Sequence, residues 1–268
     1  MPFRVVPEKV PSLPVEPKSE SPLKKLFAPV IAVAVALFKF AAPILKFLPV
    51  VLKTGGTMIL SIWFYAMNWG WQFAVGFVFL IFVHECGHLV AAKLFGLKVG
   101  APVFIPFMGA LIALKEAPKN AWVESVVGIG GPVFGAIGAA ACGWIYFATG
   151  NPLFMALAYT TCFLNLFNLV PLGFLDGGRI VTALSPWLWV IGLAIMAWFT
   201  WQHPSFLLIM ILVLSVPRLW SLFRAKTDEE KRYFEITPAQ RWTMGIAYFG
   251  LAGALAWGMH VAHIAPPQ

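Results

Sequence analysis

The chain has 268 residues, of which 60% are hydrophobic and 11% are charged, and its formal net charge is +8. A soluble domain carries roughly 25% charged residues, so this composition excludes a water-soluble surface and indicates a polytopic membrane protein. The three cysteines, Cys86, Cys142 and Cys162, lie in apolar segments and indicate no disulfide framework.

The first 22 residues are rich in proline and charge. They lack the apolar core of a cleavable signal peptide, and we expect a disordered cytosolic tail. A plain linker is the simpler interpretation of this tail, and a proline-rich docking peptide is the alternative.

Residues 23–53 form a second distinct segment. Lys25, Lys39, Lys46 and Lys53 are spaced by multiples of seven residues, which keeps them near one side of a helix. An amphipathic helix lying on an anionic leaflet explains this spacing. A helix packed on the bundle, with lysines that extend to the interface, explains it equally well.

Residues 54–264 are expected to form the transmembrane domain, because a span needs about 20 apolar residues and the uncharged runs are long enough for several. These runs break at Asn68-Trp69-Gly70, Gly150-Asn151-Pro152 and His203-Pro204. The predicted fold is an all-α polytopic membrane protein with about six to seven transmembrane helices. The expected spans are 52–68, 71–94, 122–149, 152–170, 186–202, 205–223 and 241–260.

The positive charges give the orientation. All 19 Lys and Arg residues lie on one side of the predicted spans or at the span ends on that side. Cytosolic loops carry this excess, so we expect a cytosolic N-terminus and an outside C-terminus in a bacterial cell membrane. The basicity is therefore a topology signal, and no nucleic-acid partner is expected.

The stretch "FLIFVHECGHLVAAKLFG", residues 79–96, places His84, Glu85 and His88 inside an apolar span. The histidines are four residues apart and share a helix face, as in the H-E-x-x-H spacing of metalloproteases. Neutral imidazoles bind one Zn²⁺, and the glutamate takes a proton from water. Cys86 points to the far side, and Gly87 leaves room for another backbone. Polar packing or a proton relay is the alternative, although intramembrane ionisable residues are usually functional.

A third ligand is needed to complete such a site. Between residues 125 and 217 the only charged residues are Asp176 and Arg179, within "NLFNLVPLGFLDGGRI", residues 165–180. Asp176 precedes Gly177-Gly178 and could simply cap a turn. Because it is predicted to lie in the same leaflet as the histidines, it is also the leading candidate for the third ligand.

These motifs resemble the site-2 protease family of intramembrane zinc metalloproteases. The resemblance rests on His84-Glu85-Cys86-Gly87-His88 and on Asn168-x-x-Pro171-x-x-x-Leu175-Asp176-Gly177, and it covers a catalytic core of roughly residues 71–180. It implies zinc held by His84, His88 and Asp176, with Glu85 as the general base and single-span membrane proteins as substrates.

The resemblance also implies that Asn168 sits near the site and helps to hold the peptide or its oxyanion. Gly130-Gly131-Pro132 resembles the family's Gly-Pro element, but Gly135 stands where the family often has asparagine. No segment resembles the PDZ domain of some members, so the chain resembles the compact type.

The loop at residues 97–115 is apolar, rich in glycine and proline, and too broken for a helix. Short strands that dip into the bilayer fit this composition, and an exposed strand edge could pair with an unwound substrate. A buried structural hairpin is the alternative.

Two other functions compete with proteolysis. A zinc transporter needs a series of ligands across the bilayer, and the outer half offers little beyond His203, His260 and His263. A catalytically silent scaffold of the same fold is the third possibility, and the intact motifs argue against it. Substrate cleavage with retained zinc and no vectorial zinc flux would separate the three.

Overall fold

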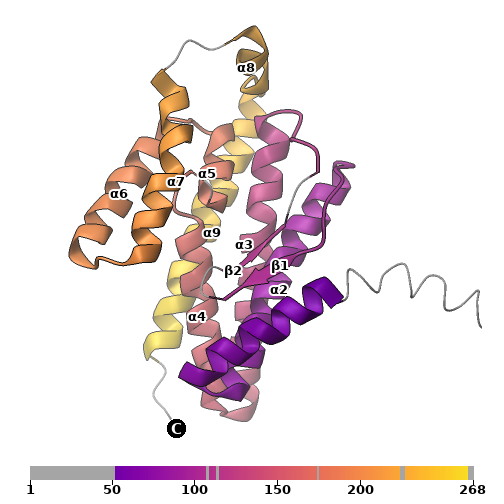
Figure 1. Cartoon of the computed structure of the whole chain (residues 1–268), viewed down its shortest axis with the longest axis vertical. Coiled ribbons are helices and arrows are strands. Elements are labelled where there is room, and N and C mark those ends of the chain that lie inside the picture. Colours follow the sequence, from indigo (N-terminus) through magenta and orange to yellow (C-terminus); the bar gives the residue numbers. More distant parts are fainter. Residues whose placement is uncertain (1–51, 107–108, 113–114, 174, 224–226, 265–268) are drawn as a thin grey trace, which may run out of the picture. The chain divides into compact units, whose positions relative to one another are not determined.

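The computed structural model describes residues 52–106, 109–112, 115–173, 175–223 and 227–264 (Figure 1). The predictions for the tail at 1–22 and for nearly all of the segment at 23–53 lie outside these residues. The division of the chain into a tail (1–22), an amphipathic segment (23–53) and a transmembrane domain (54–264) therefore stays a prediction.

Helices make up most of the described part, and each predicted span coincides with one of them (Figure 1). The elements are a helix over 52–69, α2 (Trp71–Leu94), β1 (Val103–Ile105), β2 (Gly109–Leu111), α3 (Ala121–Thr149), α4 (Pro152–Asn168), α5 (Asp176–Ile180), a 3₁₀ turn (Val181–Ala183), α6 (Leu188–Gln202), α7 (Phe206–Phe223), α8 (Asp228–Tyr233) and α9 (Pro238–Ile264).

The helical, membrane-type fold is therefore as predicted, while the number of spans is not settled. Among the described residues, Trp71–Leu94, Ala121–Thr149 and Pro238–His263 are long and apolar enough to cross a bilayer. Helices α6 and α7 contain shorter apolar stretches. A count of six to seven spans remains a prediction.

The break between α3 and α4 follows directly from the sequence Gly150-Asn151-Pro152. Gly150 ends α3 with a φ of 69°, in the left-handed region that favours glycine. The side chain of Asn151 then accepts a hydrogen bond from the backbone N–H of Leu153, and Pro152 opens α4. These three residues turn the chain back on itself, so that α3 and α4 pack as an antiparallel pair.

The predicted strands in the 97–115 loop are confirmed. β1 and β2 pair antiparallel, with Val103 opposite Leu111 and Ile105 opposite Gly109. The helix over 52–69 holds β1, because the Thr57 hydroxyl accepts a hydrogen bond from the Phe104 N–H at 3.1 Å. Thr54 donates to the carbonyl of Pro102.

The two motif-bearing regions are brought together by close packing of α2 on α3. A Cβ added at Gly87 would lie 2.1 Å from the carbonyl oxygen of Gly130, so the two helix backbones touch at these glycines. The prediction that Gly87 admits another backbone is confirmed. Helix α9 covers the other side of α3 and α4, where Tyr248 and Leu255 pack with Ala139.

Helices α6 and α7 lie side by side beside α5 (Figure 1). Their buried residues Met196, Leu208 and Ile211 pack on Leu172 and Leu175 of the segment between α4 and α5. The hairpin of α6 and α7 is therefore attached to the helices that carry the candidate site mainly through this segment.

Candidate metal centre

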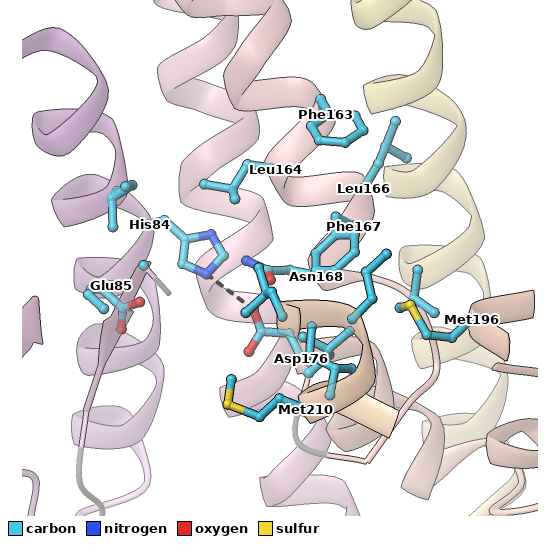
Figure 2. A pocket seen from close by; sticks show the side chains of 18 of the residues that line it. His84, Glu85, Phe163, Leu164, Leu166, Phe167, Asn168, Asp176, Met196 and Met210 are labelled. Atoms are coloured by element: carbon cyan, nitrogen blue, oxygen red, sulfur yellow. Dashed lines mark hydrogen bonds and ion pairs between the residues drawn. The ribbon is translucent and has the colours of Figure 1, made fainter. Parts of the chain in front are cut away.

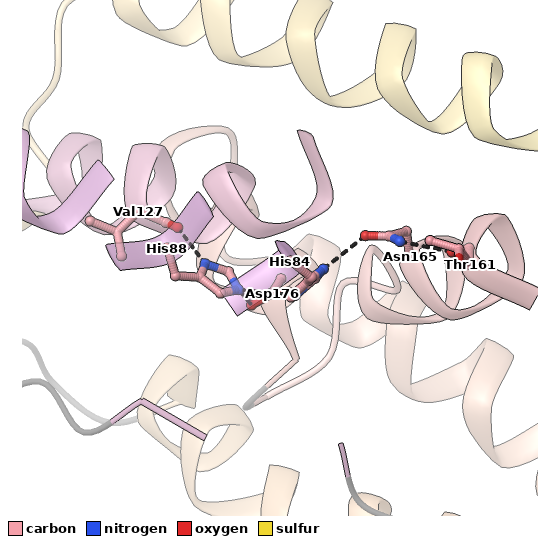
Figure 3. Close-up of polar contacts among 6 residues, drawn as sticks. All are labelled: His84, His88, Val127, Thr161, Asn165 and Asp176. Atoms are coloured by element: carbon pink, nitrogen blue, oxygen red, sulfur yellow. Dashed lines mark hydrogen bonds and ion pairs between the residues drawn. The ribbon is translucent and has the colours of Figure 1, made fainter. Parts of the chain in front are cut away.

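His84, His88 and Asp176 converge at one point, although Asp176 is 92 residues from His84. The Nε2 atoms of the two histidines are 3.1 Å apart. Asp176 places Oδ2 3.1 Å from His84 Nε2 and Oδ1 3.2 Å from His88 Nε2 (Figure 2, Figure 3). Both imidazoles are buried, and the Asp176 side chain is 12% exposed.

The hydrogen bonds on the far side of each ring show where the protons lie. His88 Nδ1 is 2.7 Å from the carbonyl oxygen of Val127, which only accepts, so this nitrogen carries the proton. His84 Nδ1 is 2.8 Å from Oδ1 of Asn165 and donates in the same way. In the neutral rings, both Nε2 atoms therefore present lone pairs toward each other and toward the Asp176 carboxylate.

This arrangement fits a zinc ion. The two Nε2 atoms are 3.1 Å apart, and each lies 3.1–3.2 Å from one oxygen of the Asp176 carboxylate, so these electron-rich atoms repel unless a cation lies among them. Nitrogen and oxygen ligands at the usual zinc distances in a tetrahedron are roughly 3.3 Å apart, close to the observed spacing. Two histidines and one carboxylate are also a donor set found in catalytic zinc sites, which leave the fourth position open.

Asp176 is not a turn-capping residue. Leu175 occupies the N-cap position of α5, and the Asp176 carboxylate turns toward the two histidines instead. Gly177 and Gly178 permit this placement, because a Cβ at Gly177 would lie 2.1 Å from the carbonyl oxygen of Leu169. The prediction of close packing at this glycine pair is confirmed.

Glu85 faces the same cavity as the ligand cluster and is 6% exposed. Figure 2 shows Glu85 beside His84 on α2, across the cavity from Asp176 and Asn168. Cys86 is half-buried and is not one of the clustered ligands. One turn of α2 thus supplies two candidate ligands and a neighbouring carboxylate.

The asparagine that contacts the cluster is Asn165, which the motif analysis did not single out. Asn168, the last residue of α4, is half-buried and lines the cavity. Asn165 lies one turn earlier, is fully buried and bonds His84. Burying an amide in an apolar span costs free energy, as burying the histidines does. This cost is a sequence signal that could have identified Asn165.

The glycine element of α3 shapes the space around the rings. A Cβ at Gly131 would lie 2.2 Å from His88 Nε2 and 2.6 Å from His84 Nε2. A Cβ at Gly135 would lie 2.2 Å from Asn165 Oδ1. Gly131 therefore leaves room for the ligand atoms, and the Asn165 amide from α4 occupies the space that a side chain at position 135 would need.

A cavity of about 800 Å³ leads to the cluster. Most of its lining is apolar and comes from α2, β2, α4, α6 and α7, with Met259 from α9. Its polar lining includes Glu85, Asn168, Asp176 and Arg179, gathered at the histidine end. A mainly apolar cavity with polar groups beside the histidines suits a ligand that is itself largely apolar.

Fold and site together define a helical membrane protein with a buried His-His-Asp cluster in metalloprotease spacing. Comparisons with known proteins agree. Residues 72–162 match the model of peptidase family M50. A protein named zinc metalloprotease from Methanocaldococcus jannaschii is 34% identical over 130 residues.

The resemblance to the site-2 protease family is thereby confirmed, and both comparisons support a metalloprotease. The aligned part covers 47% of this chain and 37% of the archaeal relative. The family match includes His84, Glu85 and His88 and ends before Asp176. The assignment of Asp176 to the site therefore rests on the geometry described above.

Proposed function

We propose that this protein is an intramembrane zinc metalloprotease that hydrolyses peptide bonds within or next to the transmembrane segments of single-span membrane proteins. The convergence of two imidazole lone pairs and a carboxylate beside Glu85 carries this proposal. The family match and the archaeal zinc metalloprotease support it.

His84, His88 and Asp176 would hold one Zn²⁺, which when bound polarises a carbonyl and acidifies water. Glu85 acts as the general base and takes a proton from the attacking water, while the oxygen of that water bonds to the scissile carbonyl carbon. The C–N bond then breaks, and Glu85 returns the proton to the leaving amine. Asn168, at the cavity wall, is assigned to holding the peptide or its oxyanion.

The substrate must unwind, because the peptide bonds of a transmembrane helix are shielded by their own hydrogen bonds. The helix over 52–69 bonds the Phe104 N–H of β1 and the carbonyl of Pro102 just before it, whereas Gly109 and Ala110 of β2 line the cavity. An unwound segment would add to the edge of β2 and present its scissile bond to Glu85.

Substrate trapping tests this function. Glu85→Gln removes the base and keeps all three ligands, so the purified variant should retain zinc and capture single-span membrane proteins without cutting them. The purified wild-type protein, reconstituted in liposomes, should cleave the captured proteins, and a zinc chelator should stop the cleavage. Vectorial zinc flux without cleavage would favour a transporter, and zinc retention with no cleavage of any captured protein would favour a silent scaffold.

The proposed orientation has its own test. Single cysteines placed near Asn151 or at the C-terminus of a cysteine-free protein should react with an impermeant thiol reagent from outside. Cysteines near Lys119 or Lys226 should react only from the cytosolic side. The opposite labelling pattern would contradict the orientation drawn from the positive charges.

A further inference from the structure

Asn165 is a fully buried amide in the apolar helix α4, and both ends of its side chain are engaged. Its Nδ2 donates to the carbonyl oxygen of Thr161 at 2.7 Å. Its Oδ1 lies 2.8 Å from His84 Nδ1, across 81 residues of sequence (Figure 3).

The bond to Thr161 fixes the direction of the amide. A backbone carbonyl only accepts, so the NH₂ group must face Thr161 and the oxygen must face His84. His84 then donates its Nδ1 proton to Asn165. The lone pair of the neutral ring is consequently on Nε2, the atom that points at Asp176 and His88.

The two histidines differ in what orients them. His88 donates to the backbone carbonyl of Val127, which no side-chain substitution removes. His84 depends on one side chain from a different helix. The space for that side chain exists because position 135 of α3 is glycine, where a Cβ would lie 2.2 Å from Oδ1 and 2.4 Å from Nδ2 of Asn165.

We propose that Asn165 is a positioning residue that fixes the tautomer and ring orientation of His84 and thereby raises the zinc affinity of the site. The inference rests on the proposed function, because it requires that the cluster bind zinc. A hydrogen-bond acceptor on the far nitrogen holds a ligating imidazole in place and increases its basicity.

Four variants of the full-length protein separate this role from simple packing. Asn165→Leu keeps the number and branching of the side-chain heavy atoms and removes the acceptor. Asn165→Asp keeps an acceptor for His84. The new carboxyl group offers an oxygen to His84 Nδ1 both when it is ionised and when its other oxygen carries a proton that faces the Thr161 carbonyl. Gly135→Ala leaves Asn165 present but displaces its amide. Thr161→Val is the matched control, because Thr161 is equally buried on α4 and its hydroxyl makes no hydrogen bond among the described residues.

The measurement is the zinc dissociation constant, obtained by competition with a chelator of known affinity, together with the absorption spectrum of the Co²⁺-loaded protein. Asn165→Leu and Gly135→Ala should bind zinc about 10–100-fold more weakly and shift the Co²⁺ spectrum. Asn165→Asp should stay within a few-fold of wild type, and Thr161→Val should match it.

Wild-type affinity and an unchanged Co²⁺ spectrum in Asn165→Leu would overturn the inference while leaving the proposed function intact. An equal loss in Thr161→Val would also overturn it, because the effect would then reflect packing of α4. If Asn165→Leu does not fold, Gly135→Ala and Asn165→Asp provide the test. Weak zinc binding by Gly135→Ala together with near-normal zinc binding by Asn165→Asp would support the inference, and any other combination would overturn it. A wild-type protein that binds no zinc would instead refute the proposed function.

Discussion

The metal centre and the hairpin of α6 and α7 differ in how their side chains are packed and exposed. Around the metal centre, glycines bring helix backbones into contact, and the buried imidazoles and Asn165 have defined hydrogen-bond partners. On the hairpin, large apolar side chains point outward, with Trp201 85% exposed and Phe206 83% exposed. Side chains of this size at such exposure suit a surface that faces lipid.

The difference reflects what each region must hold fixed. A zinc site requires three ligand atoms placed to within tenths of an ångström, which needs rigid helices and second contacts on every ligand. The hairpin is fixed at few points, including the hydrogen bond from Trp189 Nε1 to the Gly178 carbonyl at 2.8 Å. Substitutions near the centre should therefore change metal binding, whereas hairpin substitutions outside the cavity lining should leave metal binding normal and change only stability, if anything.

The largest effect is expected at Asp176. Asp176→Asn keeps the size of the side chain and loses the anionic oxygen that zinc prefers. Zinc affinity should fall by more than the roughly 10–100-fold typical of an outer-shell partner, and proteolysis should stop. Zinc content and cleavage by the purified variant measure this, and full activity with stoichiometric zinc would remove Asp176 from the site.

Gly131→Ala should come next. The added methyl would lie 2.2 Å from His88 Nε2, inside the space that the ligand atoms use. We expect zinc affinity to fall about 100-fold, comparable to the loss of a supporting contact at its strongest. Gly143→Ala, on the same helix with nothing within 4 Å of the new Cβ, is the control and should bind zinc normally. Equal behaviour of the two variants would contradict the role assigned to Gly131.

Gly192→Ala should lower the stability of the fold and leave zinc binding unchanged. A Cβ at Gly192 would lie 2.0 Å from the carbonyl oxygen of Pro171, where α6 rests on the segment before α5. Overpacking of this kind costs about 1–3 kcal/mol of unfolding free energy. Thermal unfolding should show that loss with stoichiometric zinc retained, while the exposed Ile191→Ala should unfold nearly as the wild type does. Loss of zinc in Gly192→Ala would show that the hairpin supports the site directly.

Trp201→Ala should have the smallest effect. Trp201 lies near the end of α6 and is almost fully exposed, so we expect a change in unfolding free energy within about 0.5 kcal/mol and normal zinc content. A calorimetric scan of the protein in detergent or lipid checks this. A loss of several kcal/mol would show that this surface is covered in the native assembly.

Sequence patterns located most of the helices because the relevant signals are local. Charge-free runs, together with breaks such as Gly150-Asn151-Pro152, set the helix ends to within a few residues. The H-E-x-x-H spacing likewise placed two candidate ligands on one face of α2, since four residues make about one helical turn. The strands in the 97–115 loop followed from a composition unsuited to a helix.

The sequence by itself determined the membrane class, the helix positions and the pairing of His84 with His88, because each depends on neighbours within a few residues. Only the tertiary structure decided that Asp176 faces the histidines rather than capping α5, and that Asn165 bonds His84. Those contacts span 81 and 92 residues and depend on how α2, α3 and α4 pack. That packing depends on glycine contacts between helices, which no local periodicity encodes.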